Sequence, residues 1–361
     1  MISLNENEQR YYSRQMRLSS VGEQGQICLK RASVLLVGLG GLGSPISLYL
    51  TSAGIGRLGI VEYDVIDETN LHRQVLYSFS QVNEKKLNAG VERLRALNPH
   101  IQIEAHVTDF NCENARDLVR GYDLVIDASD NFDTRYLLND ACILEKKPFI
   151  SAAILGFEGQ LSVYNYEEGP CYRCLYPKPP AIKSTLNCDE WGVLGVLPGV
   201  MGTLQANEAL KIFLKLGEVA SGRLICFDAI SSRFQEYKFK KNLNCDACGP
   251  GAKLRISSAP SQAVVEVAAQ DLRSLINSNK NLTIVDVRDL SERKRSCIEG
   301  SIHVLLADVL SGQFNISKEQ EVVFYCEYGA RSLKAAQYFS AQGFERVRSL
   351  KGGIKTYFST G

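Results

Sequence analysis

The fold of this chain is most tightly limited by short apolar runs that alternate with helical patterns from residue 33 onward. The runs are rich in β-branched residues and have the length of buried strands. They cover residues 33–37, 58–61, 101–103, 123–127 and 148–151. Helical periodicity lies between them, near residues 43–53, 84–97, 112–120 and 131–146. This alternation predicts an α/β fold, a doubly wound, Rossmann-like parallel sheet that binds ligands at the carboxyl ends of its strands.

The pattern changes after residue 153, where strand-like runs follow one another. These runs cover residues 159–164, 222–227 and 234–239, with one helical pattern near 202–216. We expect them to add antiparallel strands, which would make the sheet mixed. Residues 176–191 contain three prolines and follow neither period, which predicts a mobile loop.

A second domain is expected because 361 residues exceed what one hydrophobic core usually serves. Residues 249–263 are rich in Gly, Pro, Ser and Ala, and strand signals resume at residues 283–287 and 321–325. We therefore predict a first domain over residues 1–250, a linker over 251–262 and a small α/β domain over 263–361.

The charge balance excludes some classes of partner. The chain has 41 Lys and Arg against 40 Asp and Glu, so it has no overall attraction for nucleic acid or an anionic membrane. It contains neither a long apolar run nor a signal-peptide pattern, which predicts a cytoplasmic protein with no membrane partner. An odd number of cysteines, 11, favours thiol chemistry or metal binding over disulfides. Four of them lie in periodic apolar stretches and are expected to be core thiols: Cys28, Cys112, Cys142 and Cys226.

A glycine-rich segment, residues 38–43, follows the first strand and opens a helix. Glycines such as Gly41 and Gly43 let phosphate or ribose approach the backbone and the helix N-terminus. Glu62, with Asp64 beside it, ends the next strand, where a carboxylate suits ribose hydroxyls. A tight turn without ligand remains the alternative for the glycine segment alone.

Further polar residues follow strand ends on the same side of the predicted sheet. They are Asn70, Arg73, Lys86, Asp130 and Asn131. Two cations and a carboxylate near one polyphosphate suit phosphoryl or nucleotidyl transfer from ATP, with Asp holding Mg²⁺. Hydride transfer needs none of them, which disfavours the alternative of a nicotinamide dehydrogenase.

Two CxxC pairs, Cys171 with Cys174 and Cys245 with Cys248, predict one structural Zn²⁺ site per chain. A redox dithiol would be the rival for a single pair. The long interval between the pairs means that the metal would tie distant segments together without touching substrate.

Cys326 follows the strand at residues 321–325 and precedes a helix. Backbone N–H groups and the helix dipole at such a place favour a thiolate or a bound persulfide anion. A buried thiol at a strand end is one alternative. A phosphatase loop is another, but it needs five residues between Cys and Arg, and only four separate Cys326 from Arg331.

Several motifs in order resemble the E1-like adenylyltransferases of the MoeB/ThiF type over residues 6–250. The motifs lie at residues 10–15, 38–43, 52–56, 70–74 and 129–131. The resemblance implies a homodimer that uses ATP and Mg²⁺ to adenylate the C-terminal Gly-Gly carboxylate of a ubiquitin-like sulfur carrier of the MoaD/ThiS kind. It also implies a four-cysteine zinc.

The resemblance implies roles for six positions. It implies that Gly41 and Glu62 contact the nucleotide and that Arg73 and Lys86 bind the phosphates. It also implies that Asp130 binds Mg²⁺ and is essential for catalysis, and that Arg14 reaches into the partner subunit's site. Most members have Asp where Glu62 stands, which retains the carboxylate on a longer arm. The cysteine that matches Cys188, in the predicted loop, can form a covalent link to the activated carrier. From the residues alone, Cys188 is equally well an inert loop thiol.

Residues 262–361 resemble a rhodanese domain through the motifs at 286–288, 298–303 and 326–332. Rhodaneses carry sulfur as a persulfide on the residue that matches Cys326. Glu327 stands where a basic residue is often found, so we expect it to disfavour small anionic donors such as thiosulfate. A protein donor, a cysteine desulfurase, is expected instead.

Together these features predict adenylation of a carrier followed by sulfur transfer from a Cys326 persulfide to give a thiocarboxylate. The linker would let the second domain reach the first. The alternatives are an E1 that conjugates its carrier to target proteins and a non-catalytic module that senses persulfide. The sequence does not distinguish molybdopterin, thiamin and thiolation pathways.

Overall fold

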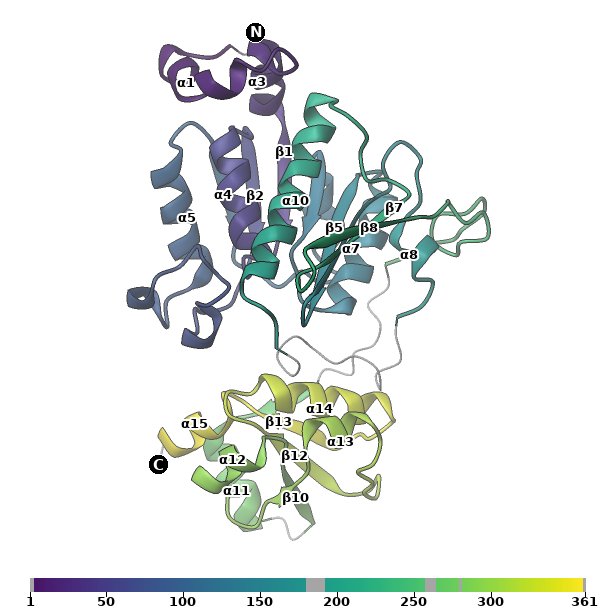
Figure 1. The fold of residues 1–361 in the computed structure, drawn as a ribbon. Coiled ribbons are helices and arrows are strands. Elements are labelled where there is room, and N and C mark those ends of the chain that lie inside the picture. Colours follow the sequence, from purple (N-terminus) through teal and green to yellow (C-terminus); the bar gives the residue numbers. More distant parts are fainter. Residues whose placement is uncertain (1–2, 180–191, 257–263, 279–280, 360–361) are drawn as a thin grey trace. The chain divides into compact units, whose positions relative to one another are not determined.

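The structure is a computed structural model that describes residues 3–179, 192–256, 264–278 and 281–359. The described residues form two compact units, residues 3–179 with 192–256, and residues 264–359 (Figure 1). The part of the predicted loop that holds Cys188 lies outside the described residues.

The larger unit is built on one mixed sheet of eight strands. In chain order they are β1 (Ser33–Val37), β2 (Arg57–Val61), β3 (Gln102–His106), β4 (Leu124–Asp127), β5 (Phe149–Leu155), β6 (Glu158–Tyr164), β7 (Arg223–Asp228) and β8 (Arg233–Lys238). Their spatial order is β3-β2-β1-β4-β5-β6-β7-β8. In this spatial order, the first five strands, from β3 across to β5, pair in parallel, and the strands from β5 to β8 pair antiparallel. The predicted mixed, doubly wound sheet is confirmed.

Helices cover both faces of this sheet. Helices α4 (Gly43–Ala53), α5 (Lys86–Leu97) and α10 (Val196–Leu214) lie on one face, and α6 (Ala115–Arg120) and α7 (Phe132–Leu144) on the other. Alternate residues of β1 enter the two cores, with Leu36 in the first and Leu35 in the second. Because β1 is buried on both sides, its residues 34–37 form a continuous apolar run.

Helix α10 begins six residues before the predicted helix. Pro198 and Gly199, which obscure the periodicity, both lie in its first turn. Proline is tolerated there because the N–H groups of a first helical turn have no partner within the helix.

Three N-terminal helices precede the sheet: α1 (Glu6–Tyr11), α2 (Ser13–Met16) and α3 (Gly22–Arg31). A capping box between Asn5 and Glu8 starts α1. The Asn98 Nδ2 donates to the Tyr12 hydroxyl at 2.8 Å, which fixes the helices against the sheet unit. The short segments η1 (Glu68–Asn70), η2 (Phe79–Gln81) and α8 (Tyr172–Leu175) complete the described elements of this unit.

The smaller unit is a parallel sheet of five strands in the order β11-β10-β12-β13-β9. Its strands are β9 (Val265–Val267), β10 (Leu282–Asp286), β11 (Ile302–His303), β12 (Glu321–Tyr325) and β13 (Val347–Leu350). Its helices are α11 (Ala269–Ser278), α12 (Leu290–Arg295), α13 (Leu306–Leu310), α14 (Ala330–Ala341) and α15 (Gly353–Ser359). Cys326 directly follows the central strand β12. Among the described residues of both units, no helix is long and apolar enough to cross a membrane.

Candidate active site and metal centre

A cavity of about 670 Å³ opens at the carboxyl ends of β1, β2 and β4. Most of the predicted nucleotide-site residues line it: Gly41, Glu62, Asp64, Arg73, Lys86, Asp130 and Asn131. Gly43, Asn70 and Arg14 are not among the lining residues. The cavity continues along β6, β7 and β8, past Gln160, Asp228 and Tyr237. It therefore has room for more than a nucleotide.

The glycine segment turns tightly between β1 and α4. Gly38 has φ +94°, and a Cβ there would clash with the backbone of Ala128, which directly follows the neighbouring strand β4. A Cβ on Gly43 would clash with the Gly38 carbonyl oxygen. Gly43 therefore lets α4 begin directly behind the turn, while Gly40 and Gly41 face the cavity.

Glu62 holds the glycine segment to the end of β2. Its carboxylate accepts hydrogen bonds from the backbone N–H groups of Leu39 at 2.9 Å, Tyr63 at 2.8 Å and Asp64 at 2.9 Å. The longer arm of glutamate thus reaches the Leu39 amide from the neighbouring strand. Glu62 both lines the cavity and fixes its wall.

The two cations are positioned by backbone contacts and one carboxylate. The Lys86 Nζ lies 3.1 Å from the Asp64 carboxylate, and only 6% of Lys86 is exposed. The Arg73 guanidinium donates to the Thr69 carbonyl at 3.1 Å. The Asn70 carbonyl accepts the Arg73 N–H at 3.1 Å, so Asn70 orients the arginine without lining the cavity.

Acidic side chains concentrate at one end of the cavity. Burial, followed by the charges of Asp64, Asp109, Glu62 and Asp130, raises the pKa of Tyr63 to about 12. Burial and the Asp64 charge also raise the pKa of Asp109. Carboxylates that repel one another in this way provide oxygen ligands that suit a divalent cation.

Asp130 follows β4 and is exposed to the cavity. The next residue, Asn131, is the N-cap of α7, and its side-chain oxygen accepts the Thr134 N–H at 2.8 Å. Because the cap is made by Asn131, the Asp130 carboxylate is not needed to start the helix.

Sequence reasoning missed a buried ion pair beneath Asp130. The Arg135 Nε donates to the Asp127 carboxylate at 2.7 Å, and the Ser151 hydroxyl donates to the same carboxylate at 2.7 Å. Burial would lower the pKa of Arg135, but the Asp127 charge outweighs it and holds that pKa above its ordinary value. Asp127 also accepts the Ser129 N–H at 2.9 Å, so the pair fixes the backbone that leads to Asp130. The only sequence signal was an aspartate at the end of an apolar strand.

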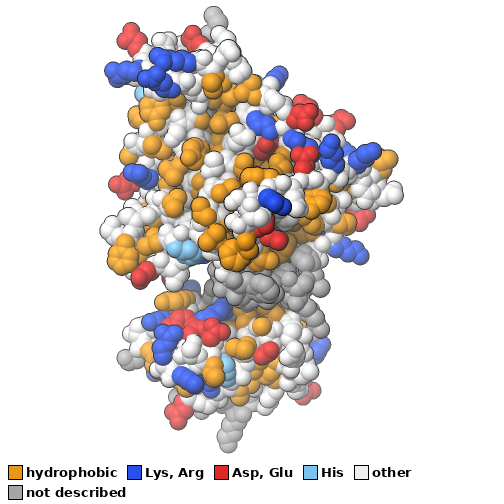
Figure 2. Space-filling model, in the orientation of Figure 1, with side chains coloured by type: hydrophobic (Ala, Val, Ile, Leu, Met, Phe, Trp, Pro, Cys, Tyr) orange, Lys and Arg blue, Asp and Glu red, His pale blue; other side chains and the backbone are white. Residues whose placement is uncertain are grey.

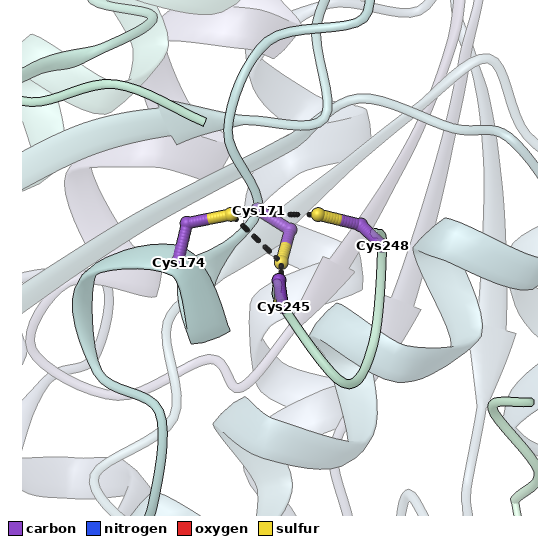
Figure 3. Close-up of side chains that lie close together, drawn as sticks. All are labelled: Cys171, Cys174, Cys245 and Cys248. Carbon is purple, nitrogen blue, oxygen red and sulfur yellow. Dashed lines mark hydrogen bonds between the residues drawn. The ribbon is translucent and has the colours of Figure 1, made fainter. Parts of the chain in front are cut away.

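The four CxxC cysteines meet in one cluster, with their sulfurs pointing toward one another (Figure 3). The Cys171 sulfur lies 3.7 Å from those of Cys174 and Cys245, and the Cys174 sulfur lies 3.4 Å from that of Cys248. The edge of a tetrahedron with metal–sulfur bonds of ~2.3 Å is about 3.8 Å. Burial raises the pKa of Cys171 and Cys248, whereas hydrogen bonds from the backbone outweigh burial and lower the pKa of Cys245. A cation would be needed to hold Cys171 and Cys248 as thiolates beside it. The cluster can hold a metal ion.

In the smaller unit, the Cys326 sulfur is buried under its own loop. It accepts the Gly329 N–H at 3.1 Å and the Ser332 hydroxyl at 3.6 Å. Gly329, with φ +102°, is the N-cap of α14, so the loop closes around the sulfur and leads directly into the helix. Donors aimed at this sulfur can stabilise an anion on it.

The charges around Cys326 are already paired. The Glu327 carboxylate accepts from Arg288 at 2.7 Å and lies 3.7 Å from the Lys355 Nζ. Arg331 makes a two-pronged contact with Glu292, at 2.8 and 2.6 Å. The loop therefore does not present Arg331 as an unpaired cation to a small anion.

The cysteines expected in the core do not all lie there. Of the four cysteines expected in the core, Cys142 is buried, but Cys28 is exposed and Cys112 is half-buried, so that prediction is wrong for both. Cys226 is also half-buried and lines the cavity, so the prediction is wrong for it too. Arg14 is exposed on α2. Basic side chains gather at the end of the molecule that holds the N-terminal helices (Figure 2).

Two family models match the chain. One, described as the ThiF family, matches residues 12–247, and the other, described as a rhodanese-like domain, matches residues 268–360. The protein called "Adenylyltransferase and sulfurtransferase MOCS3" of Culex quinquefasciatus is 39% identical, over 99% of this chain and 89% of its own length. The "Sulfur carrier protein adenylyltransferase" of Thermus thermophilus is 49% identical, over 66% of this chain and 90% of its own.

Solved structures share the fold of the larger unit. E. coli MccB with ATP superposes with a TM-score of 0.58 and 23% identity, over 68% of this chain and 76% of that chain. E. coli MccB with MccA-N7isoASN gives a TM-score of 0.59 and 22% identity, over 68% and 76% of the two chains.

Proposed function

The chain belongs to the ThiF family and carries a rhodanese-like domain, and on that basis we propose that it adenylates a sulfur-carrier protein and then converts it to a thiocarboxylate. The observation that carries the proposal is the cavity that collects Arg73, Lys86 and Asp130 around the glycine segment, in a chain that also holds a cradled Cys326. The two similar proteins named above support both halves of it. The test is ATP–pyrophosphate exchange, which should require a carrier that ends in Gly-Gly.

The first step uses the cavity of the larger unit. The carrier's terminal carboxylate attacks the α-phosphorus of ATP, and pyrophosphate leaves with the electron pair of the broken P–O bond. Arg73 and Lys86 bind the phosphates and neutralise their charge, while Gly41 and Gly40 let the nucleotide approach the backbone. The extension of the cavity along β6 to β8 accommodates the carrier's tail.

A bound Mg²⁺ would neutralise charge on the phosphates and orient them for in-line attack. We propose that Asp130 holds it, with the neighbouring Asn131 fixing the start of α7. Glu62 and Asp64 are proposed to face the ribose, and Asn70 to orient Arg73.

The second step uses Cys326. The outer sulfur of its persulfide attacks the acyl carbon, and AMP leaves as the C–O bond breaks. A second thiol then attacks the Cys326 sulfur, which releases the thiocarboxylate and leaves a disulfide that a cellular dithiol must reduce. Cys188 is proposed as the second thiol, although it lies outside the described residues. Because both sites belong to one chain, the persulfide is present at high effective concentration.

The paired charges at Cys326 support a protein persulfide, such as that of a cysteine desulfurase, as the donor. With Arg331 bound to Glu292, and Glu327 held near the nucleophile by Arg288, thiosulfate finds little positive charge to bind. A protein donor does not rely on such a cation, because it binds through its own surface.

We propose that the four-cysteine cluster holds Zn²⁺ and that it locks α8 to the end of the larger unit. The division into residues 1–250, 251–262 and 263–361 remains our proposal for the domains. Zinc would act on stability alone, because none of the four cysteines lines the cavity.

Replacing Cys174 with serine should remove the metal and lower the melting temperature by on the order of 10 °C. The metal content of the purified protein, read by plasma emission, should fall from one zinc per chain to near zero. Cys112→Ser, which changes a half-buried cysteine outside the cluster, should retain the zinc. Full zinc content in Cys174→Ser would refute the site.

We also propose a homodimer in which Arg14 completes the partner's site. The Gln15 amide donates to the Ala53 carbonyl at 3.2 Å, at the opposite end of α4 from the glycine segment. Eleven helical residues, about 16 Å, lie between these ends. Arg14 is therefore far from the cavity of its own chain and can act only on a second copy.

Mixing two inactive variants tests this arrangement. Arg14→Ala and Asp130→Asn should each be inactive alone, but a mixed dimer would combine an intact cavity with an intact Arg14. After subunit exchange, the mixture should recover about a quarter of wild-type exchange activity, because half the dimers are mixed and each has one complete site. A mixture as inactive as its components would contradict action between subunits.

A further inference from the structure

One buried polar group in the cavity has no role in the account above. Gln74 is 5% exposed and lines the cavity, and its side-chain oxygen has no hydrogen-bond partner among the described residues. The side chain lies over the glycine segment, since a Cβ on Gly40 would be 3.5 Å from its Nε2. Its backbone is fixed, because its N–H donates to the Asn70 carbonyl at 3.0 Å and its carbonyl accepts from Tyr77 at 3.2 Å.

A buried acceptor without a donor destabilises the free protein, because the oxygen has lost its hydrogen bonds to water. The cavity wall could have been completed by an apolar side chain of similar size, without that loss. The unpaired oxygen is explained if a bound substrate supplies the missing donor. Gln205 shows the contrast: its oxygen is also unpaired, but its Nε2 donates to the Asp127 carbonyl at 2.7 Å and it does not line the cavity.

Because the unpaired Gln74 oxygen is a hydrogen-bond acceptor, the ligand group that meets it must be a donor. Phosphate and carboxylate groups offer only acceptors at neutral pH, so they cannot satisfy the Gln74 oxygen. The donors that the reactants carry are the ribose hydroxyls and the adenine amino group of the nucleotide, and the peptide N–H groups of the carrier's tail. All of these are neutral N–H or O–H donors.

We propose that Gln74 is a positioning residue for adenylation, whose side-chain oxygen accepts a hydrogen bond from a neutral N–H or O–H group of the bound reactants. This inference rests on the proposed function, since it assumes that a nucleotide and a carrier tail enter the cavity. It adds a residue that holds the reactants beside Arg73, which itself is fixed by the same Asn70 carbonyl.

Gln74→Met tests the proposal, because methionine retains the volume and removes the amide. The melting temperature of the free variant should equal or exceed that of the wild type. Its carrier-dependent ATP–pyrophosphate exchange should fall about 10- to 100-fold. Gln205→Met is the matched control for stability: it loses the bond to Asp127, so its melting temperature should fall.

The reactant that supplies the donor can be identified from whether ATP affinity or the kinetic constants for the carrier change. If the nucleotide supplies it, ATP binding to the variant without carrier weakens. In the wild type, 2′- or 3′-deoxy-ATP then shows the same defect when the donor is a ribose hydroxyl, and purine riboside triphosphate, which lacks the amino group, shows it when the donor is adenine. If the carrier tail supplies it, ATP binding is unchanged and the KM for carrier rises or kcat falls. A lower melting temperature for Gln74→Met, or unchanged ATP binding together with unchanged exchange, would overturn the proposal.

These outcomes are separate from failure of the proposed function. Wild-type protein that binds ATP but shows no exchange with any carrier would remove the adenylation proposal. The melting temperatures and the ATP affinities of the two variants would still decide whether Gln74 serves a ligand.

Discussion

Asp130→Asn is expected to reduce carrier-dependent ATP–pyrophosphate exchange by roughly 10³-fold, which corresponds to about 4 kcal/mol of lost transition-state stabilisation. The substitution removes one negative oxygen ligand from the acidic end of the cavity and leaves the side-chain volume unchanged. The fold should not suffer, because the adjacent Asn131 caps α7 and Asp130 is exposed. Exchange of labelled pyrophosphate into ATP measures the effect.

Asp133→Asn is the matched control for this substitution. Asp133 is an exposed aspartate in the first turn of the same helix and does not line the cavity. Its replacement should keep the exchange rate within about twofold of the wild-type rate, because surface substitutions away from a site have small effects. Equal activity of Asp130→Asn and the wild type would remove Asp130 from the catalytic machinery.

Cys326→Ser should separate the two halves of the reaction. Sulfur transfer to the carrier should fall roughly 10³-fold or more, because serine cannot carry a persulfide. ATP–pyrophosphate exchange should remain near wild type, since the cavity lies wholly in the larger unit. Mass spectrometry of the carrier after incubation with ATP and a persulfide donor measures the transfer.

Cys297→Ser provides the control, because Cys297 is an exposed cysteine of the same unit. It should transfer sulfur normally.

In the wild type, a cysteine-desulfurase persulfide should load Cys326 faster than thiosulfate does, given the pairing of Arg331 with Glu292. Faster loading from thiosulfate would contradict the assignment of a protein donor. Thiocarboxylate formation by Cys326→Ser would show that sulfur reaches the carrier by another route.

Much of the fold could be predicted because its central parallel strands are buried on both faces. Every residue of β1 is buried and residues 34–37 are all apolar, so this run is visible without knowledge of its neighbours. The edge of the sheet is different. The periodic run around Cys226 looks like a core strand, yet the cysteine is only half-buried and lines the cavity. Burial there depends on tertiary layers that a local pattern does not record.

The clustering of the candidate site was predictable for a related reason. Glu62 follows β2 and Asp130 follows β4, the two parallel strands that flank β1, and such strand ends meet at one edge of the sheet. Partners that meet only through tertiary contacts were not predictable. The Asp127–Arg135 pair and the Arg288–Glu327 contact join residues that lie on different elements or loops, so no local period relates them. The unpaired oxygen of Gln74 likewise appears only when its surroundings are known.

The central claim is that one chain both activates a carrier and supplies its sulfur. The most direct measurement is the mass of a Gly-Gly carrier from the same genome after incubation with the wild-type protein, ATP, Mg²⁺ and a persulfide donor under reducing conditions. The account predicts a carrier that is heavier by one exchange of sulfur for oxygen, with AMP and pyrophosphate formed in equal amounts. A carrier that is unchanged in mass, or that becomes attached to other proteins while Cys326 stays loaded with sulfur, would contradict it.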